Sequence, residues 1–209
     1  MDDNRQQHTT TIWQQSLTGF RDALAHQPMP GCGAAASVVA GLGLALMLKG
    51  LHLTQKHQTS EARAALIEEG ERLKQQLAPL ADKDVIAFEE LMAAFNLPQE
   101  NELEKRARRH AIQAAATEAV KVPLQTARLC QAALRLGERA GAYSERQFKS
   151  DALAGGELLA AAMRSVLFNV LANIDALGSQ AEKQHAQAAH DELKQQATVL
   201  LEKIFQRLG

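Results

Sequence analysis

The sequence predicts an all-α fold: a single-domain helical bundle with a buried central helix. Alanine, leucine, glutamine and glutamate, which favour helices, dominate the chain of 209 residues. Aromatic residues make up only 4% of the chain, and no segment alternates β-branched and polar residues as a strand does. We find no internal repeat or linker, so residues 1–209 are predicted to form one domain, with 1–11 flexible.

Prolines and capping residues divide the first half of the chain into three predicted helices. The first runs from about Ile12 to His26, and the prolines at positions 28 and 30 end it. The second covers about Gly33 to Leu53. The third begins after a capping residue at 59 or 60 and reaches about Phe95, with Pro79 kinking or dividing it.

Four further helices are predicted in the second half. One covers about Glu102 to Val120, and Pro123 opens the next as its first-turn residue. After a loop, Ser150 caps a helix that reaches about Leu177. The last helix is amphipathic and ends near Leu208, with apolar residues at helical spacing.

Charge and cysteine content exclude several classes of protein. The net charge is −1, which gives no general reason to bind nucleic acid or an anionic membrane. The two cysteines offer no disulfide framework, and the polar N-terminus resembles no secretory signal, so we expect a cytoplasmic chain. The seven histidines show no metal-ligand spacing, and no metal is expected.

The segment from Gly31 to Leu48 carries no charge and approaches the length of a membrane span. It holds four glycines and few large apolar residues, which favours a buried core helix. A helical protein resting on a membrane through this segment is the weaker alternative.

The predicted helix from Ser150 to Leu177 is apolar nearly all round, which places it at the centre of the bundle. Three polar residues, Ser165, Asn169 and Asn173, recur on one face of it at every fourth position. Buried amides need partners, so hydrogen bonds between helices are the favoured interpretation. The alternative is that these residues line a ligand pocket or a subunit contact.

Two acids are candidates for chemistry. Asp84 lies on the apolar face of its helix, where a carboxylate is costly unless it is paired or used; an ion pair and a functional role carry similar weight. Asp151 begins a helix, where the helix dipole alone favours an acid. Asp151 and Asn169 share a face but stand about 27 Å apart along it. An antiparallel helix from a second subunit could bring them together.

Glycines at Gly31 and Gly33 open the second helix, where free backbone amides can approach a ligand closely. Tight helix packing demands the same small residues, so this signal is weak by itself. Cys32 between them could act as a nucleophile at a helix start. A small residue that fits a crowded turn is the favoured interpretation.

Four segments in this order resemble the folate cyclodeaminase/cyclohydrolase family over almost the whole chain. They are the Pro-Gly-rich helix start, the Asp-x-x-Ala-Phe helix that ends in Leu-Pro, the Val-Pro-Leu element and the Ser-Asp-Ala helix that ends in Asn-Val-x-x-Asn. In this chain they read PMPGCGAAASVVAGLGLALMLKG, DVIAFEELMAAFNLP, AVKVPLQTARLC and SDALAGGELLAAAMRSVLFNVLANIDAL.

The resemblance implies an all-helical homodimer that binds a folate derivative. It implies Asp84 as the catalytic acid–base group and Asp151 as the second choice. The substrate-binding residues that it implies are Pro30, Gly31, Gly33, Ser150, Asn169 and Asn173. Tetrahydrofolate is the carrier of the substrate, and no other cofactor and no metal is implied.

The activity that the resemblance favours is that of a methenyltetrahydrofolate cyclohydrolase, a hydrolase that opens a cyclic amidine to formyltetrahydrofolate. A formiminotetrahydrofolate cyclodeaminase, which releases ammonia as a lyase does, is the close alternative. This chain has Gly31-Cys32-Gly33 where the family has three glycines. That altered turn favours an alternative of another class, a non-catalytic helical dimer that binds folate or a partner protein.

Overall fold

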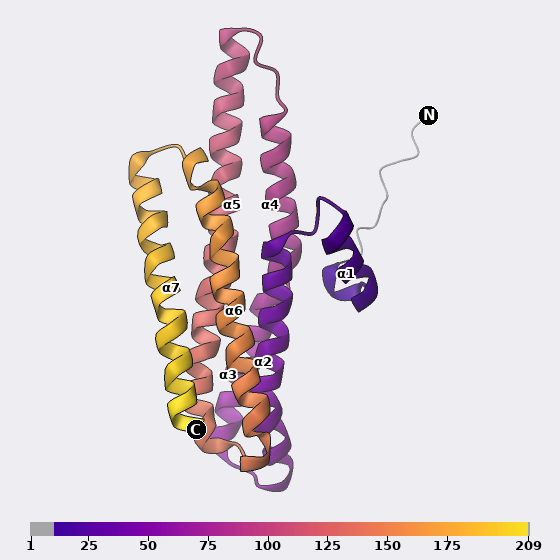
Figure 1. The fold of residues 1–209 in the computed structure, drawn as a ribbon, viewed down its shortest axis with the longest axis vertical. Helices are drawn as coiled ribbons and strands as arrows, with labels where there is room; N and C mark the ends of the chain where they lie inside the picture. Colours follow the sequence, from indigo (N-terminus) through magenta and orange to yellow (C-terminus); the bar gives the residue numbers. More distant parts are fainter. Residues whose placement is uncertain (1–10, 209) are drawn as a thin grey trace.

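The computed structural model describes residues 11–208, which form an elongated bundle of long helices (Figure 1). No strand occurs in this range. Residues 1–11 are predicted to be flexible, but all of them except Thr11 lie outside the described residues. The elements are η1 (Ile12–Gln14), α1 (Leu17–His26), α2 (Cys32–His57), α3 (Glu61–Leu77), α4 (Leu80–Phe95), α5 (Glu102–Ala140), η2 (Gly141–Tyr143), η3 (Arg146–Phe148), α6 (Lys149–Asn173), η4 (Ile174–Ala176) and α7 (Gln180–Leu208).

The core of the bundle is built around α6, which packs along α2, α5 and α7. Leucine and methionine side chains such as Leu44, Leu134, Leu159 and Met163 are almost fully buried there. α2 also contacts α3, α4 and α5, whereas α1 stands to one side of the bundle (Figure 1). The predicted central position of α6 is confirmed. Its burial on all sides is not, because Phe168 is 66% exposed.

Glycines bring α2 and α6 into backbone contact. A Cβ atom built on Gly155 would lie 2.5 Å from the carbonyl oxygen of Gly43, and one on Gly43 would lie 2.9 Å from the oxygen of Gly155. Real Cβ atoms do not approach oxygen so closely, so the two helices could not meet here with any larger residue. At this crossing the small residues of α2 and α6 therefore serve helix packing.

The predicted elements of the first half are close to those in the structure. Pro79 divides the predicted third helix into α3 and α4, and the Ser60 side chain accepts a hydrogen bond from the backbone N–H of Arg63. The predicted first helix is shorter than expected, because the 3-10 turn η1 precedes α1 and Ser16 caps the helix.

The predicted break before Pro123 is wrong, because α5 runs without interruption through this residue. A proline inside a helix has no N–H to give to the carbonyl four residues earlier, which here belongs to Ala119. The side chain of Asn173 on α6 supplies the missing donor, with Nδ2 3.3 Å from the Ala119 oxygen. A neighbouring helix thus satisfies the carbonyl that the proline leaves without a partner.

The start of α6 also differs from the prediction. The helix begins at Lys149, and Ser150 lies inside its first turn instead of capping it. The expected loop before it contains two short 3-10 turns, η2 and η3.

Two helical segments of the described chain, α2 and 146–176, are long and apolar enough to cross a membrane by length and composition. Most of the apolar window of α2 is buried inside the bundle, as in the core helix of a globular protein. Two such helices are weak support for a membrane protein.

Gly155→Ala should destabilise the protein by about 1–3 kcal/mol, because the added methyl group would overlap the Gly43 carbonyl and force α2 and α6 apart. Gly156→Ala is the matched control. A Cβ there meets its nearest atom at 3.4 Å, and alanine favours the helix by up to about 1 kcal/mol. Urea denaturation of both variants measures the difference; equal effects would contradict the close-contact explanation.

Asn173→Ala should cost about 1–3 kcal/mol of unfolding free energy, because it leaves the Ala119 carbonyl without a donor. In a Pro123→Ala background the same change should cost less, since alanine returns a backbone N–H to that carbonyl. A double-mutant cycle measured by chemical denaturation tests this coupling. Additive effects of the two substitutions would show that Asn173 does not compensate for the proline.

Candidate functional site

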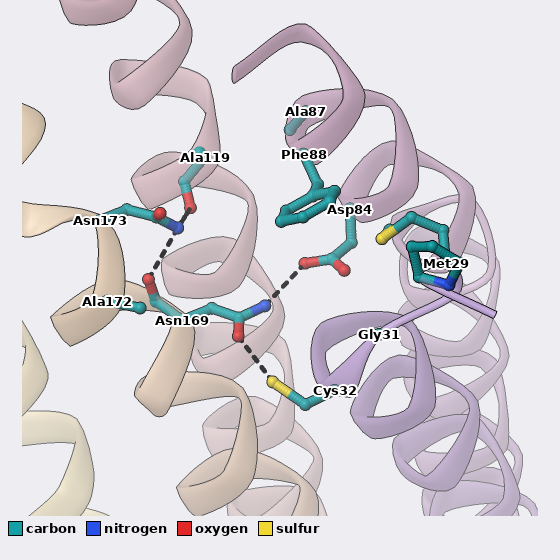
Figure 2. Close-up of a pocket in the computed structure, with 11 residues that line it drawn as sticks. Met29, Gly31, Cys32, Asp84, Ala87, Phe88, Ala119, Asn169, Ala172 and Asn173 are labelled. Carbon is teal, nitrogen blue, oxygen red and sulfur yellow. Dashed lines mark hydrogen bonds between the residues drawn. The ribbon is translucent and has the colours of Figure 1, made fainter. Parts of the chain in front are cut away.

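A small pocket of about 160 Å³ lies where the start of α2 meets α4, α5 and the end of α6 (Figure 2). The loop between α1 and α2, which includes a cis peptide bond between Met29 and Pro30, forms one of its walls. Its lining residues are Pro28, Met29, Gly31, Cys32, Asp84, Ala87, Phe88, Ala119, Asn169, Ala172 and Asn173. These side chains come from segments far apart in the sequence, so only the folded bundle creates the pocket.

Hydrogen bonds connect three side chains across the pocket floor. The Cys32 thiol donates to Oδ1 of Asn169 over 2.6 Å, and Nδ2 of Asn169 donates to Oδ1 of Asp84 over 3.1 Å (Figure 2). The Asn169 amide therefore has a defined orientation, with its oxygen toward the thiol and its nitrogen toward the carboxylate. Asn169 thus forms hydrogen bonds to two other helices, as the favoured interpretation predicts, and it also lines the pocket. That this pocket binds a ligand stays a prediction.

Asp84 is the buried acid of this pocket, with only 7% of its surface exposed. Desolvation raises the pKa of its carboxyl group above the ordinary value, and hydrogen bonds from Asn169 and from the backbone of Ala34 lower it in part. Ala34 lies in the first turn of α2, where backbone N–H groups have no partner within the helix and Gly31 offers no capping side chain. The carboxyl group of Asp84, on α4, thus caps the N-terminus of α2.

Gly33 leaves the space that Asp84 occupies. A Cβ atom on this residue would stand 2.0 Å from Oδ1 of Asp84 and 2.6 Å from Nδ2 of Asn169. Gly31 is different, since a Cβ atom there would meet only the Met29 sulfur, at 3.9 Å. Of the two glycines, Gly33 is the one that the site geometry requires.

Cys32 takes part in the pocket as a hydrogen-bond donor. Burial raises the pKa of its thiol, and the negative charge of Asp84 raises it further, although the cysteine's own backbone N–H opposes this. The raised pKa favours the neutral thiol and weakens Cys32 as a nucleophile. Cys130 lies elsewhere, in the core, where burial raises its pKa to about 12.

Asn173 lies one turn beyond Asn169 and connects the pocket wall to α5. Its Nδ2 donates to the Ala119 oxygen and to the Asn169 backbone oxygen, 2.9 Å away (Figure 2). Both protons of the amide are used in this way, so Oδ1 is the atom that can accept a hydrogen bond from a ligand. On the other wall, Phe88 is 37% exposed, and its ring lies beside the carboxyl group of Asp84 (Figure 2).

The structure brings together five of the residues proposed from sequence, namely Gly31, Gly33, Asp84, Asn169 and Asn173. Pro30 lines an adjoining groove of about 770 Å³ between α1 and α4, which shares Met29 with the pocket.

Ser150 and Asp151 lie at the opposite end of α6 and do not line the pocket. Asp151 instead forms an ion pair with Lys49 of α2, with 2.8 Å between Oδ2 and Nζ. Within a single chain, the two predicted catalytic acids are therefore separate.

Some pocket residues were not proposed from sequence. Phe88 follows Asp84 by one helical turn, and that spacing could have identified it. Met29 and Ala119 carry no such signal, because only the fold places them at the pocket. Within residues 11–208, no group of three or more histidine, cysteine, aspartate or glutamate side chains could hold a metal ion.

Comparison with known proteins agrees with this architecture. The formiminotransferase-cyclodeaminase family model matches residues 16–195. The methenyltetrahydrofolate cyclohydrolase of Methylorubrum extorquens is 32% identical over 197 residues, which cover 92% of this chain and 95% of that protein. The formimidoyltransferase-cyclodeaminase of Sus scrofa is 27% identical over 91% of this chain, which spans 37% of that longer protein.

The fold has a counterpart among solved structures. The crystal structure of formiminotetrahydrofolate cyclodeaminase from Thermotoga maritima superposes with a TM-score of 0.82 and 25% identity, over 94% of this chain and 97% of that one. The matched family model covers most of the chain, and the cyclohydrolase relative matches nearly end to end. The chain therefore belongs to the formiminotransferase-cyclodeaminase family.

Proposed function

We propose that this protein is a folate-dependent one-carbon enzyme that hydrolyses methenyltetrahydrofolate to formyltetrahydrofolate. The observation that carries the proposal is the buried carboxyl group of Asp84, in a pocket that no basic side chain from residues 11–208 lines. Such a site favours a cationic ligand. The methenyl carbon of the substrate is part of an amidinium cation shared between two folate nitrogens.

The carboxylate of Asp84 has two tasks in this proposal. Its charge stabilises the cation as it binds, and it accepts the proton of the water molecule that attacks the methenyl carbon. The product of this step is a neutral tetrahedral adduct with one hydroxyl group. No group other than the residues of the pocket is needed for the step.

Ring opening returns the same proton. The bond from the adduct carbon to one folate nitrogen breaks, that nitrogen takes the proton from Asp84, and the hydroxyl group loses its proton to solvent as the formyl carbonyl forms. The overall reaction consumes one water molecule and releases one proton. Asn173 and Phe88 line the same pocket, and in this proposal they orient the substrate: Oδ1 of Asn173 accepts a hydrogen bond, and the Phe88 ring stacks on it.

The raised pKa of Asp84 suits both directions of proton transfer. A carboxylate of ordinary pKa is a weak base, whereas desolvation in the pocket makes this one a better acceptor of the proton from water. Asn169 holds the carboxyl group in place through its hydrogen bond to Oδ1.

The cyclodeaminase reaction is the second candidate, because a solved relative with the same fold is named for it. There a folate nitrogen attacks the formimino carbon, and ammonia leaves with a proton that Asp84 can deliver. Both reactions pass through a tetrahedral carbon next to the same carboxyl group. Assays of the purified protein with methenyl and with formimino substrate, following absorbance and ammonia, distinguish them. Turnover of neither would favour a non-catalytic folate-binding or partner-binding dimer.

Asp84→Asn should lower the turnover of methenyltetrahydrofolate by about 10²–10⁴-fold, because the amide can neither accept nor return the proton. Loss of the methenyl absorbance, corrected for the uncatalysed rate, measures it. Glu90→Gln, which removes an exposed acid of the same helix, should leave turnover unchanged. Full activity of the Asp84 variant would refute its assigned role.

The pH dependence of the native enzyme follows from the same group. The active form is the carboxylate, so turnover should fall as pH decreases through the pKa of Asp84, with a midpoint above the ordinary value of 3.8. The free energy of unfolding should change in the opposite direction. Relative to Asp84→Asn, the native protein should lose stability as pH rises from the unfolded-state pKa through the raised folded-state pKa. Parallel unfolding curves of the two proteins at each pH measure this.

Gly33→Ala should reduce turnover by at least about 10-fold, because the methyl group would displace Asp84 and Asn169 from their positions. Gly31→Ala is the control, since its Cβ atom has open space beyond Met29. Steady-state assays of both variants, with circular dichroism to confirm folding, test the difference. A Gly31 variant as inactive as the Gly33 variant would contradict the geometry.

A further inference from the structure

Cys32 occupies a position on α2 where its thiol has no acceptor within its own helix. Hydroxyl groups inside a helix commonly donate to the carbonyl of the residue four positions earlier, as the Ser37 hydroxyl does to the Gly33 oxygen over 2.9 Å. Cys32 is the first residue of α2, and the residue four positions before it, Pro28, lies outside the helix. The thiol proton is donated across the pocket instead, to Oδ1 of Asn169 on α6 (Figure 2).

This hydrogen bond determines which end of the Asn169 amide faces Asp84. A side-chain amide has an acceptor oxygen and a donor nitrogen, and half a turn about the last side-chain bond exchanges the two. With the oxygen bonded to the thiol of Cys32, the nitrogen faces Asp84 and donates to its Oδ1 over 3.1 Å. Among residues 11–208 the Asn169 side chain forms no other hydrogen bond, so these two contacts set its orientation.

The opposite orientation of the amide would suit a protonated Asp84. The amide oxygen would then accept the carboxyl proton, whereas a charged carboxylate would be repelled by that oxygen. The thiol of Cys32 opposes the rotation, because its sulfur is only a weak acceptor for the nitrogen that would face it. Burial raises the pKa of this thiol, and the negative charge of Asp84 raises it further, so Cys32 keeps the proton that it donates.

Few titratable groups surround the carboxyl group of Asp84. Among the described residues that line the pocket, Asp84 from α4 and Cys32 from α2 are the two titratable side chains, and the walls from α5, from α6 and from the loop between α1 and α2 contribute neutral residues. Two neighbouring acids of α4, Asp82 and Glu89, line the adjoining groove instead. The protonation of Asp84 therefore depends on its burial and its hydrogen bonds, one of which comes from Asn169.

We propose that Cys32 is a positioning residue of this site, whose thiol holds Asn169 in the orientation that donates to Asp84 throughout the reaction cycle. The orientation stands on the geometry of the pocket alone, whereas its effect on turnover rests on the proposed function. Asp84 stays a base to lower pH, because its carboxylate form keeps a donor. After Asp84 has taken a proton from the attacking water, Asn169 presents only N–H groups and offers that proton no acceptor. The proton then passes to the folate nitrogen as the ring opens.

A carboxyl titration of the ligand-free protein tests the orientation without any assay of activity. Cys32→Ser keeps a donor at this position and Cys32→Ala removes it, and both side chains are smaller than the original. The midpoint of the Asp84 titration should be about half a pH unit higher in Cys32→Ala than in Cys32→Ser, because one neutral hydrogen bond is lost. Carbon-13 NMR of the aspartate carboxyl groups measures the midpoints, and the signal missing from Asp84→Asn identifies Asp84. Equal midpoints would overturn the proposal.

A double-mutant cycle separates an effect through Asn169 from a direct one. If position 32 acts by orienting the amide, Cys32→Ser and Cys32→Ala should give equal Asp84 midpoints once Asn169→Ala is added to each. Asn169→Leu, which keeps nearly the volume of the amide without its polar atoms, replaces Asn169→Ala if circular dichroism shows that protein to be unfolded. A difference that persists in these backgrounds would show that Cys32 acts on Asp84 without the amide, and would overturn its positioning role.

The thiol reports the same coupling from the opposite side. Iodoacetamide should modify Cys32 in the native protein and spare Cys130, which is fully buried with a pKa raised to about 12. Asp84→Asn removes the negative charge that raises the pKa of the Cys32 thiol, so alkylation at neutral pH should become several-fold faster. Glu90→Gln, at an exposed position of α4, should leave the rate unchanged. An Asp84→Asn protein that is alkylated at the native rate would contradict the coupling.

Turnover tests the consequence for catalysis. In Cys32→Ala the low-pH limb of kcat/KM for methenyltetrahydrofolate should move to higher pH by about the same half unit as the carboxyl titration, whereas Cys32→Ser should stay close to the native profile. On the high-pH plateau KM should change little, since the thiol acts on the acid. A change in KM alone, or identical profiles of the two variants, would overturn the role in turnover. A protein that shows the carboxyl shift but turns over no folate would refute the proposed function and leave the orienting role supported.

Discussion

The candidate site depends on one close contact, between the carboxyl group of Asp84 on α4 and the first turn of α2. The absent side chain at Gly33 makes this contact possible, and the backbone of Ala34 stabilises it. Asn169 then reaches the same carboxyl group from α6. Three helices thus meet at one buried carboxyl group, and the pocket is the space that remains beside it.

Burial makes Asp84 a better proton acceptor, and it also lowers the stability of the folded protein. Removing a carboxylate from water without a cation beside it opposes folding, which the hydrogen bonds from Asn169 and Ala34 offset only in part. A core residue of this kind would be replaced if stability alone mattered. The charge is compensated when a cationic ligand enters, so binding and the protonation state of Asp84 are linked. The Cys32 thiol contributes a neutral donor and adds no charge to the pocket.

Much of the fold could be predicted from the sequence, because helix formers, capping residues and prolines act locally. Ser60 correctly indicated where α3 begins, and Pro79 indicated the break between α3 and α4. The predicted helix break at Pro123 was wrong because Asn173 donates the hydrogen bond that the proline cannot give to Ala119. Asn173 lies fifty residues further along the chain, so no local pattern reveals this contact. Asp84 and Asn169 were found because polar groups on apolar helix faces need partners. The roles of Ser150 and Asp151, the homodimer, the cytoplasmic location and the absence of a cofactor stay predictions.

The pairing of Pro123 with Asn173 has a consequence for how the binding wall could change its chemistry. As long as position 123 cannot donate, both amide protons of Asn173 are committed to backbone oxygens and only its oxygen is presented to a ligand. If another residue replaced the proline, its backbone N–H would bond to the Ala119 oxygen and free one amide proton of Asn173. The Asn173 side chain could then both donate a hydrogen bond to a ligand and accept one from it. A residue with no atom in the pocket lining thereby sets the hydrogen-bonding polarity of that lining, and an engineer seeking to admit a different heterocycle could begin there.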